Sequence, residues 1–189
     1  MPVSENDTQK KLIESFKELM MTHPFKKITI KKITDGAGVI RPTFYNHFRD
    51  KHEMFEVILD KELFNSLFDL VNIDMNKEAT KMIFTYFDKN RLFYQRAFEV
   101  SGQNSFRSIL TKKISDLFRF ILETKDYRIN EQATVLSREQ LVEFTSMNIT
   151  FIIEMWLTGD TGHKVDANQI FEAYIFLITH NFEEFFEEK

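Results

Sequence analysis

The sequence predicts an all-α protein of about nine helices. Apolar residues recur at helical spacing through most of the 189-residue chain, and no run alternates apolar and polar residues between hairpin turns. Only five Gly and three Pro interrupt these patterns, whereas 21 Phe residues provide a large aromatic core. We therefore expect a small helical module at the N-terminus, followed by a larger helical domain.

The first helix is expected from about residue 7 or 8 to Thr22. His23-Pro24 ends it, because the residue before a proline is pushed out of the helical conformation. Its apolar residues fall on one face, which is the pattern of an amphipathic helix. They are Leu12, Ile13, Phe16, Leu19 and Met20.

Residues 28–51 predict two short helices around a tight turn. Thr29 can cap the first, which runs from Ile30 to about residue 36, because its hydroxyl can accept an unpaired backbone N–H. In the turn Ala37-Gly38-Val39, Gly38 tolerates positive φ, and Ala37 lets the two helices approach. Pro42 fits the first turn of the second helix. This pattern predicts a helix-turn-helix at about 29–48, whose second helix is suited to enter a DNA major groove.

The same residues closely resemble the DNA-binding segment of the TetR family of bacterial transcription regulators, over about the first third of the chain. The resemblance rests on residues whose order and spacing agree with that family. They are Ile28-Thr29, Ala37-Gly38-Val39, Thr43-Phe44-Tyr45-Asn46-His47-Phe48 and Lys51. Two residues depart from the family pattern. Ile40 replaces the usual Ser or other capping residue and weakens the start of the recognition helix, and Thr34 replaces a small Ala.

The resemblance implies which side chains bind DNA. These are Lys31, Arg41, Pro42, Thr43, Tyr45, Asn46, His47 and Lys51. Arg41 is expected to read a base edge, because its guanidinium suits bidentate hydrogen bonding to guanine. Phosphate contacts, which set position rather than sequence preference, are expected for Lys31, Tyr45, His47 and Lys51.

The charge of the chain is divided between its two parts. The chain carries −4 overall, but residues 8–51 hold ten Lys and Arg against four acids, a charge of +6. Residues 52–189 carry −8. Only the N-terminal part therefore has the electrostatics that phosphate binding needs.

The remaining elements are predicted from caps and apolar periodicity. A capping box over Asp50–Glu53 opens a long helix to about Leu70, and Ser137 with Gln140 forms a second box. The expected helices after the first long one span 76–89, 91–100, 105–123, 137–159 and 166–186, with loops at 124–136 and 160–165.

The last two helices are expected to form a homodimer, as in proteins that resemble this one. They carry more apolar residues than one side of a helix pair needs: Phe144, Met147, Phe151, Met155, Ile170, Tyr174, Leu177, Ile178 and Phe182. The alternative is that these residues are simply the core of the monomer. A dimer would bind a near-palindromic operator, with half-sites about 34–36 Å apart.

A small-molecule effector site is expected in the C-terminal domain, where aromatic residues occur beside amides. Residues 90–106 also resemble one branch of the TetR family, which includes regulators of dihydroxyacetone kinase genes. The candidate residues are Phe93, Tyr94, Gln103, Asn104, Phe106, Asn148, Phe151 and Trp156. The alternative is plain core packing, since 21 Phe residues must be buried somewhere.

Other classes of function lack sequence support. We expect no enzyme, because no catalytic constellation or phosphate-binding loop stands out, and no cofactor. His180 with Glu183 or Glu184 has metal-ligand spacing, but a solvated polar face explains it better, so no metal site is predicted. There is no Cys, no apolar signal region and no apolar stretch of about 18 residues, so we expect a cytoplasmic protein without membrane contact.

Together these features predict a DNA-binding domain at 6–66 and an effector-binding and dimerisation domain at 67–189. The expected function is that of a transcriptional regulator, a repressor released by a small-molecule effector. The alternative is a DNA-binding regulator controlled by a protein partner, or acting as an activator, with no small-molecule ligand. A third hypothesis, an enzyme fused to a helix-turn-helix, would require a catalytic site.

Overall fold

A computed structural model describes residues 5–125, 127–130, 135–159 and 165–186. Within these residues every regular element is a helix. They form nine helices besides short 3₁₀ turns, when the continuous helix through 53–72 is counted once. The predicted all-α class is therefore confirmed.

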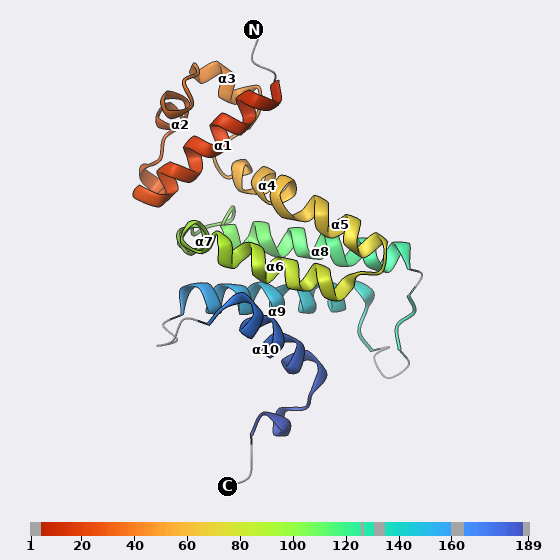
Figure 1. The fold of residues 1–189 in the computed structure, drawn as a ribbon. Coiled ribbons are helices and arrows are strands. Elements are labelled where there is room, and N and C mark those ends of the chain that lie inside the picture. Colours follow the sequence, from red (N-terminus) through yellow and green to blue (C-terminus); the bar gives the residue numbers. More distant parts are fainter. Residues whose placement is uncertain (1–4, 126, 131–134, 160–164, 187–189) are drawn as a thin grey trace.

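Three helices gather at one end of the molecule, as Figure 1 shows. They are α1 (Glu5–Thr22), α2 (Ile30–Ala37) and α3 (Arg41–Tyr45), with a 3₁₀ turn, η1 (Phe25–Lys27), between the first two. The predicted turn chemistry is present, because the Thr29 hydroxyl accepts from Lys32 N at 3.2 Å and Gly38 has φ 67°. Ile40 occupies the N-cap of α3 and provides no side-chain cap.

Helices α1 and α2 lie close together at Gly36. A Cβ atom at this residue would lie 2.3 Å from the Ser15 hydroxyl, which is too close for any real contact. The Ser15 hydroxyl itself donates to the Ile33 carbonyl at 2.8 Å and is buried. Gly36 thus allows α1 to satisfy a backbone carbonyl of α2, beside the small residue Ala37 that the sequence indicated.

One long helix leads from this unit into the rest of the chain. It consists of α4 (Glu53–Leu59), the π-helical turn η2 (Asp60–Phe64) and α5 (Asn65–Asn72). The Asp50 carboxylate caps this helix by accepting hydrogen bonds from the backbone N–H groups of His52 and Glu53. The Glu53 carboxylate accepts from the backbone N–H of Arg49, rather than from that of Asp50 as the predicted capping box requires. The sequence predicted the helix but not the π turn.

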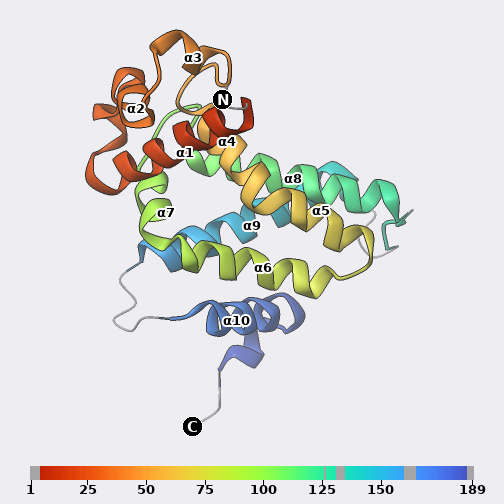
Figure 2. The same ribbon diagram turned by 45° about the horizontal axis from the view of Figure 1, so that its top comes forward.

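The remaining helices form layers beneath this long helix (Figure 1). They are α6 (Asn76–Lys89), α7 (Arg91–Phe98), α8 (Phe106–Thr124), α9 (Arg138–Thr158) and α10 (Ala167–Thr179), followed by the 3₁₀ turn η4 (Phe182–Phe185). Helix α8 packs along α9, and α10 packs against α6. Figure 2 also places α10 at the end opposite α1–α3.

The final helix is shorter than predicted. It ends at Thr179, not near 186, because His180 adopts an extended backbone that cannot continue the helix. Asn181 then caps the separate turn η4 with Glu184. Helix α7 likewise ends at residue 98 rather than 100. Within the predicted loops, residues 126, 131–134 and 160–164 lie outside the described part.

Part of the expected dimer face is used within the protomer. Tyr174 is buried, with its ring 5.5 Å from that of Phe84, and Ile170 also packs against the core. For Tyr174 the alternative of monomer core therefore holds, and Ile170 is half-buried, because α10 turns this side toward α6. The side chain of Phe182 lies outside the described residues.

Candidate nucleic-acid interface

Aromatic packing forms part of the core of the N-terminal unit. Phe44 of α3 packs against Phe48 with ring centroids 5.4 Å apart, and both are buried as the spacing predicted. Phe16 of α1 contacts Phe55 of α4 at 5.3 Å in an edge arrangement. Aromatic pairs of this kind add to the free energy of burial, so the buried side of α3 and the contact between α1 and α4 are both stabilised.

The polar side of α3 faces solvent. Arg41, Pro42, Tyr45 and Asn46 are exposed, and Thr43 and His47 are half-buried. The structure therefore brings these six predicted DNA-contact residues together on one short helix and the turn after it. Five of them, all except Pro42, offer side-chain hydrogen-bonding groups that can reach base edges or phosphates without disturbing the core.

Arg41 and Tyr45 interact on the exposed face of α3. The Arg41 guanidinium donates to the Tyr45 hydroxyl at 3.0 Å and lies 5.7 Å from the centre of its ring. This contact orients the guanidinium across the helix face and limits its rotamers. An oriented guanidinium loses less side-chain entropy on binding than a free one.

The two predicted lysines differ in their surroundings. Lys31 is exposed on α2 and pairs with Asp35 at 2.6 Å. Lys51 is partly buried, and its ammonium donates to the carbonyls of Phe25 and Ile28 at 2.7 and 2.9 Å. Burial lowers the pKa of Lys51. Two of its three N–H donors are thus used inside the protein, which leaves one for a phosphate.

Other cations of this unit are free to meet an anion. Lys26, Lys27 and Lys32 are exposed, and within the described residues they have no ion-pair partner. Lys26 and Lys27 come from η1, and Lys32 comes from α2, which packs against α3. The positive charge of residues 8–51 therefore includes side chains that internal acids do not neutralise.

The structure does not gather the eight predicted effector residues into one site. Phe93, Tyr94, Phe106 and Trp156 are buried in the core. The Tyr94 ring packs 4.9 Å from Phe93 and 5.1 Å from Phe106, which is close aromatic packing rather than a cavity lining. Gln103 and Asn104 are exposed and line a small pocket of about 240 Å³.

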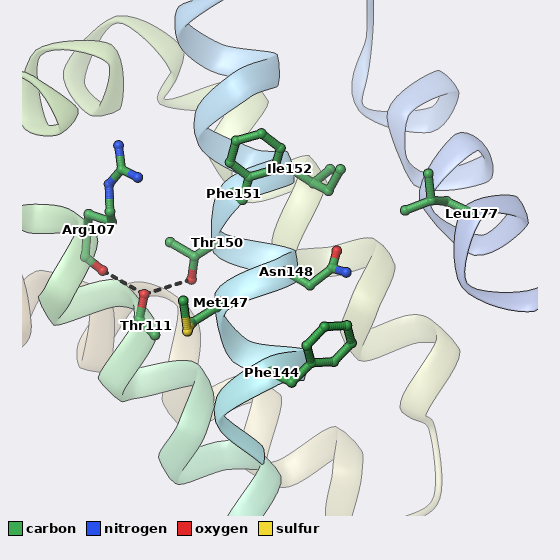
Figure 3. Close-up of a pocket in the computed structure, with 9 residues that line it drawn as sticks. All are labelled: Arg107, Thr111, Phe144, Met147, Asn148, Thr150, Phe151, Ile152 and Leu177. Carbon is green, nitrogen blue, oxygen red and sulfur yellow. Dashed lines mark hydrogen bonds between the residues drawn. The ribbon is translucent and has the colours of Figure 1, made fainter. Parts of the chain in front are cut away.

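Asn148 and Phe151 line a different pocket, of about 530 Å³, on the face of α9 (Figure 3). Leu177 of α10 and Arg107 and Thr111 of α8 also line it. In Figure 3, Asn148 points toward α10, and the Thr111 hydroxyl bonds to Thr150 of α9. This size falls in the range of ligand pockets, but four of the side chains that line it are also expected at the dimer interface. They are Phe144, Met147, Phe151 and Leu177.

Sequence patterns did not reveal a polar network that joins the DNA-binding unit to the C-terminal core. The Tyr86 hydroxyl donates to Glu62 of η2 at 3.0 Å and lies 2.5 Å from the Tyr94 hydroxyl. Burial is the main reason that the pKa of Tyr94 is raised well above its ordinary value. Lys17 of α1 also bonds to Glu62, so the bonded residues of this network are 8 to 45 residues apart in the chain. No local sequence motif could therefore have indicated the network.

The described residues contain no group of three or more His, Cys, Asp or Glu side chains placed to hold a metal ion. His180 instead bonds through Nδ1 to the Thr179 hydroxyl and the Phe176 carbonyl. Of the helices in the described part, none is long and apolar enough to span a bilayer.

Comparison with known proteins identifies both parts of the chain. Residues 12–58 match the family described as bacterial regulatory proteins of the tetR family, and residues 74–180 match the family described as a transcriptional regulator C-terminal region. A curated relative is the HTH-type dhaKLM operon transcriptional activator DhaS of Lactococcus lactis subsp. lactis (strain IL1403). It is 29% identical over 97 residues, which cover 49% of this chain and 50% of that protein. The match thus spans about half the length of the relative.

Solved structures share the fold at low sequence identity. The dihydroxyacetone kinase operon activator DhaS has a TM-score of 0.60 and 19% identity, covering 90% of this chain and 93% of that one. FadR of Thermus thermophilus, a repressor solved with lauroyl-CoA, has a TM-score of 0.57 and 14% identity, with 96% of each chain covered. NalD of Pseudomonas aeruginosa, a repressor of a multidrug efflux pump, has a TM-score of 0.55 and 15% identity, covering 91% of this chain and 96% of that one.

The C-terminal match alone covers more than half of the chain, and the N-terminal match contains the helix-turn-helix just described. The chain belongs to the TetR family of DNA-binding transcriptional regulators.

Proposed function

We propose that residues 6–66 bind an operator through α3, with Arg41 reading a base edge and Thr43 and Asn46 completing the contact surface. Pro42 lies on the same face, and Lys31, Tyr45, His47 and the remaining donor of Lys51 hold phosphates. The observation that carries this proposal is the exposed polar face of α3, with Arg41 oriented by Tyr45. The positive charge of residues 8–51 supports it.

The DNA-binding form is a homodimer through α9 and α10. Apolar side chains at helical spacing support this proposal, because Phe144 is 68% exposed and Phe151 57% exposed on α9. Met147 and Met155 extend the same stripe, and Leu177 and Ile178 of α10 are also exposed. A second copy of the chain would remove this apolar surface from water.

Residues 67–189 form the effector-binding and dimerisation domain of this proposal. A small molecule bound there releases the repressor by changing the spacing of the two recognition helices. Two of the similar structures, NalD and FadR, are repressors, and FadR was solved with lauroyl-CoA. The protein acts in the cytoplasm as a regulator and not as an enzyme.

A second candidate is an activator controlled by a protein partner. Two observations favour it. The curated relative DhaS is a transcriptional activator. In addition, four of the predicted effector residues are packed in the core rather than around a cavity. A ligand that co-purifies with the protein supports the first candidate, and a co-purifying protein supports the second.

The experiment that tests DNA binding is selection from a random duplex library with the purified full chain. We expect an inverted repeat with half-site centres about 10 base pairs apart, since two recognition helices must lie on one face of the duplex. Enrichment of no sequence would contradict the proposal. Enrichment of an isolated half-site would contradict the dimer.

A further inference from the structure

Ile40 is an apolar side chain that the fold leaves in solvent. It is 71% exposed at the N-cap of α3, whereas the neighbouring Val39 packs against the core. Only the Ile40 backbone contributes to α3, because its carbonyl accepts from Thr43 N at 3.0 Å. Within the described residues, its side chain is not among those packed against the hydrophobic core.

Folding does not explain isoleucine at this position. Several other helices of the chain begin with a capping side chain, such as Thr29 before α2, Ser105 before α8 and Asp166 before α10. Ile40 provides no such hydrogen bond, and its exposed side chain also gains nothing from burial. Ile40 therefore adds to stability neither through a capping hydrogen bond nor through apolar burial. This points to a contact between its side chain and another molecule.

The side chains next to Ile40 indicate what that partner is. Arg41 and Thr43 follow it on the face proposed to enter the major groove. The edges of the bases there are polar, with one apolar exception, which is the C5-methyl group of thymine. An exposed aliphatic side chain at the start of the recognition helix complements that methyl group.

We infer that Ile40 packs on the C5-methyl group of one thymine in each operator half-site and selects thymine at that position. This inference rests on the proposed entry of α3 into the major groove. It adds a specificity-determining residue at a position where this chain departs from the family pattern. Arg41 would supply hydrogen-bonded readout of one base, and Ile40 apolar readout of another.

The test replaces each thymine of the selected operator in turn with deoxyuridine, which removes the methyl group and keeps base pairing. With the wild-type protein, affinity should fall about fourfold at one position of a half-site, because burying one such carbon group is worth about that factor. Replacement in both half-sites should cost about sixteenfold, since well-separated sites add. Ile40→Ala should bind the parent operator more weakly and lose the response to deoxyuridine at this position.

Two control variants keep the inference falsifiable. Met21→Ala removes another exposed apolar side chain of the same unit, at the end of α1, and should keep the deoxyuridine response. Thr43→Ser removes the only methyl group of Thr43, and this variant should also keep the deoxyuridine response. Because Ile40 is exposed, the thermal unfolding midpoint of Ile40→Ala should match that of the wild type.

Two results would overturn the inference: no deoxyuridine position affects the wild type, or Thr43→Ser abolishes the response while Ile40→Ala retains it. In the second case Thr43 reads the methyl group. If the protein selects no DNA sequence at all, the proposed function fails first, before deoxyuridine is ever used. The two failures are therefore distinguishable.

Discussion

The Lys17 ammonium lies 2.6 and 2.5 Å from the two carboxylate oxygens of Glu62, and this ion pair joins α1 to the π turn of the long helix. Tyr86 donates to the same carboxylate and contacts Tyr94 in the core. Lys113 of α8 pairs with Asp60, the other acid at the start of this turn. The DNA-binding unit is thus tied to the C-terminal domain by polar contacts as well as by the continuous helix.

The Lys17–Glu62 pair should contribute measurably to stability. Both side chains are about two-thirds or more buried, so their attraction is less screened than that of a surface pair. A double-mutant cycle with Lys17→Met and Glu62→Gln should give a coupling energy of about 1 kcal/mol. Urea unfolding at one fixed protein concentration would measure it, because the free energy of unfolding of a dimer depends on concentration.

The control cycle uses Lys31 and Asp35, an exposed pair on α2. Its coupling energy should be about 0.5 kcal/mol or less, as is usual for surface pairs on a helix. Equal coupling in the two cycles would show that the Lys17–Glu62 contact is no more than a surface ion pair.

The sequence predicted the fold well where the signal is local. Thr29 and Ser137 cap their helices as expected, and Gly38 has the positive φ that the turn requires. These features depend on hydrogen bonds within three residues and on glycine sterics, so a single sequence is enough to find them. The buried pair Phe44 and Phe48 followed from helical spacing alone.

Features that depend on distant contacts were not predictable. The role of Gly36 depends on Ser15, and the inward position of Lys51 depends on the carbonyls of Phe25 and Ile28. The predicted effector residues do not lie together in one site. Aromatic composition alone cannot distinguish residues that fill a core from residues that line a cavity. Tyr94 and Phe106 are buried and pack against each other, so they fill the core.

Operator affinity should fall steeply with salt. Each phosphate that a Lys or Arg neutralises contributes about −0.9 to the slope of log affinity against log salt concentration. Several of the cations in residues 8–51 are exposed, so we expect a slope of several units in fluorescence anisotropy titrations. Lys77→Ala, in the acidic C-terminal domain, should leave the slope unchanged. A flat dependence for the wild type contradicts the proposed contact surface.

Charged substitutions on the exposed apolar face should dissociate the dimer. Phe151→Glu with Leu177→Glu places two carboxylates where a second copy is proposed to pack, and burying an unpaired charge is costly. Sedimentation velocity should show monomers, and operator affinity should drop because half-site binding loses one recognition helix. Glu172→Gln, an exposed polar change on α10, is the control. An intact dimer with both glutamates would place the interface elsewhere.

Lys51→Met should destabilise the DNA-binding unit. It removes the donor for the carbonyls of Phe25 and Ile28, and each such lost hydrogen bond costs about 1 kcal/mol. We expect the free energy of unfolding to fall by about 1–3 kcal/mol in urea titrations. The salt slope of the variant separates the two roles of this lysine. A decrease of about one unit supports the proposed phosphate contact, and an unchanged slope contradicts it.

The most direct test of the proposed DNA readout is a titration of wild type and Arg41→Ala against every single-base variant of the selected operator. The wild type should lose about 1–3 kcal/mol of binding free energy for substitutions at the base pair that Arg41 reads. Arg41→Ala should bind the parent operator more weakly by a similar amount and become indifferent to that base pair. If Arg41→Ala instead weakens all variants uniformly and keeps every base preference, Arg41 contacts phosphate, and the assignment of base readout to Arg41 is wrong.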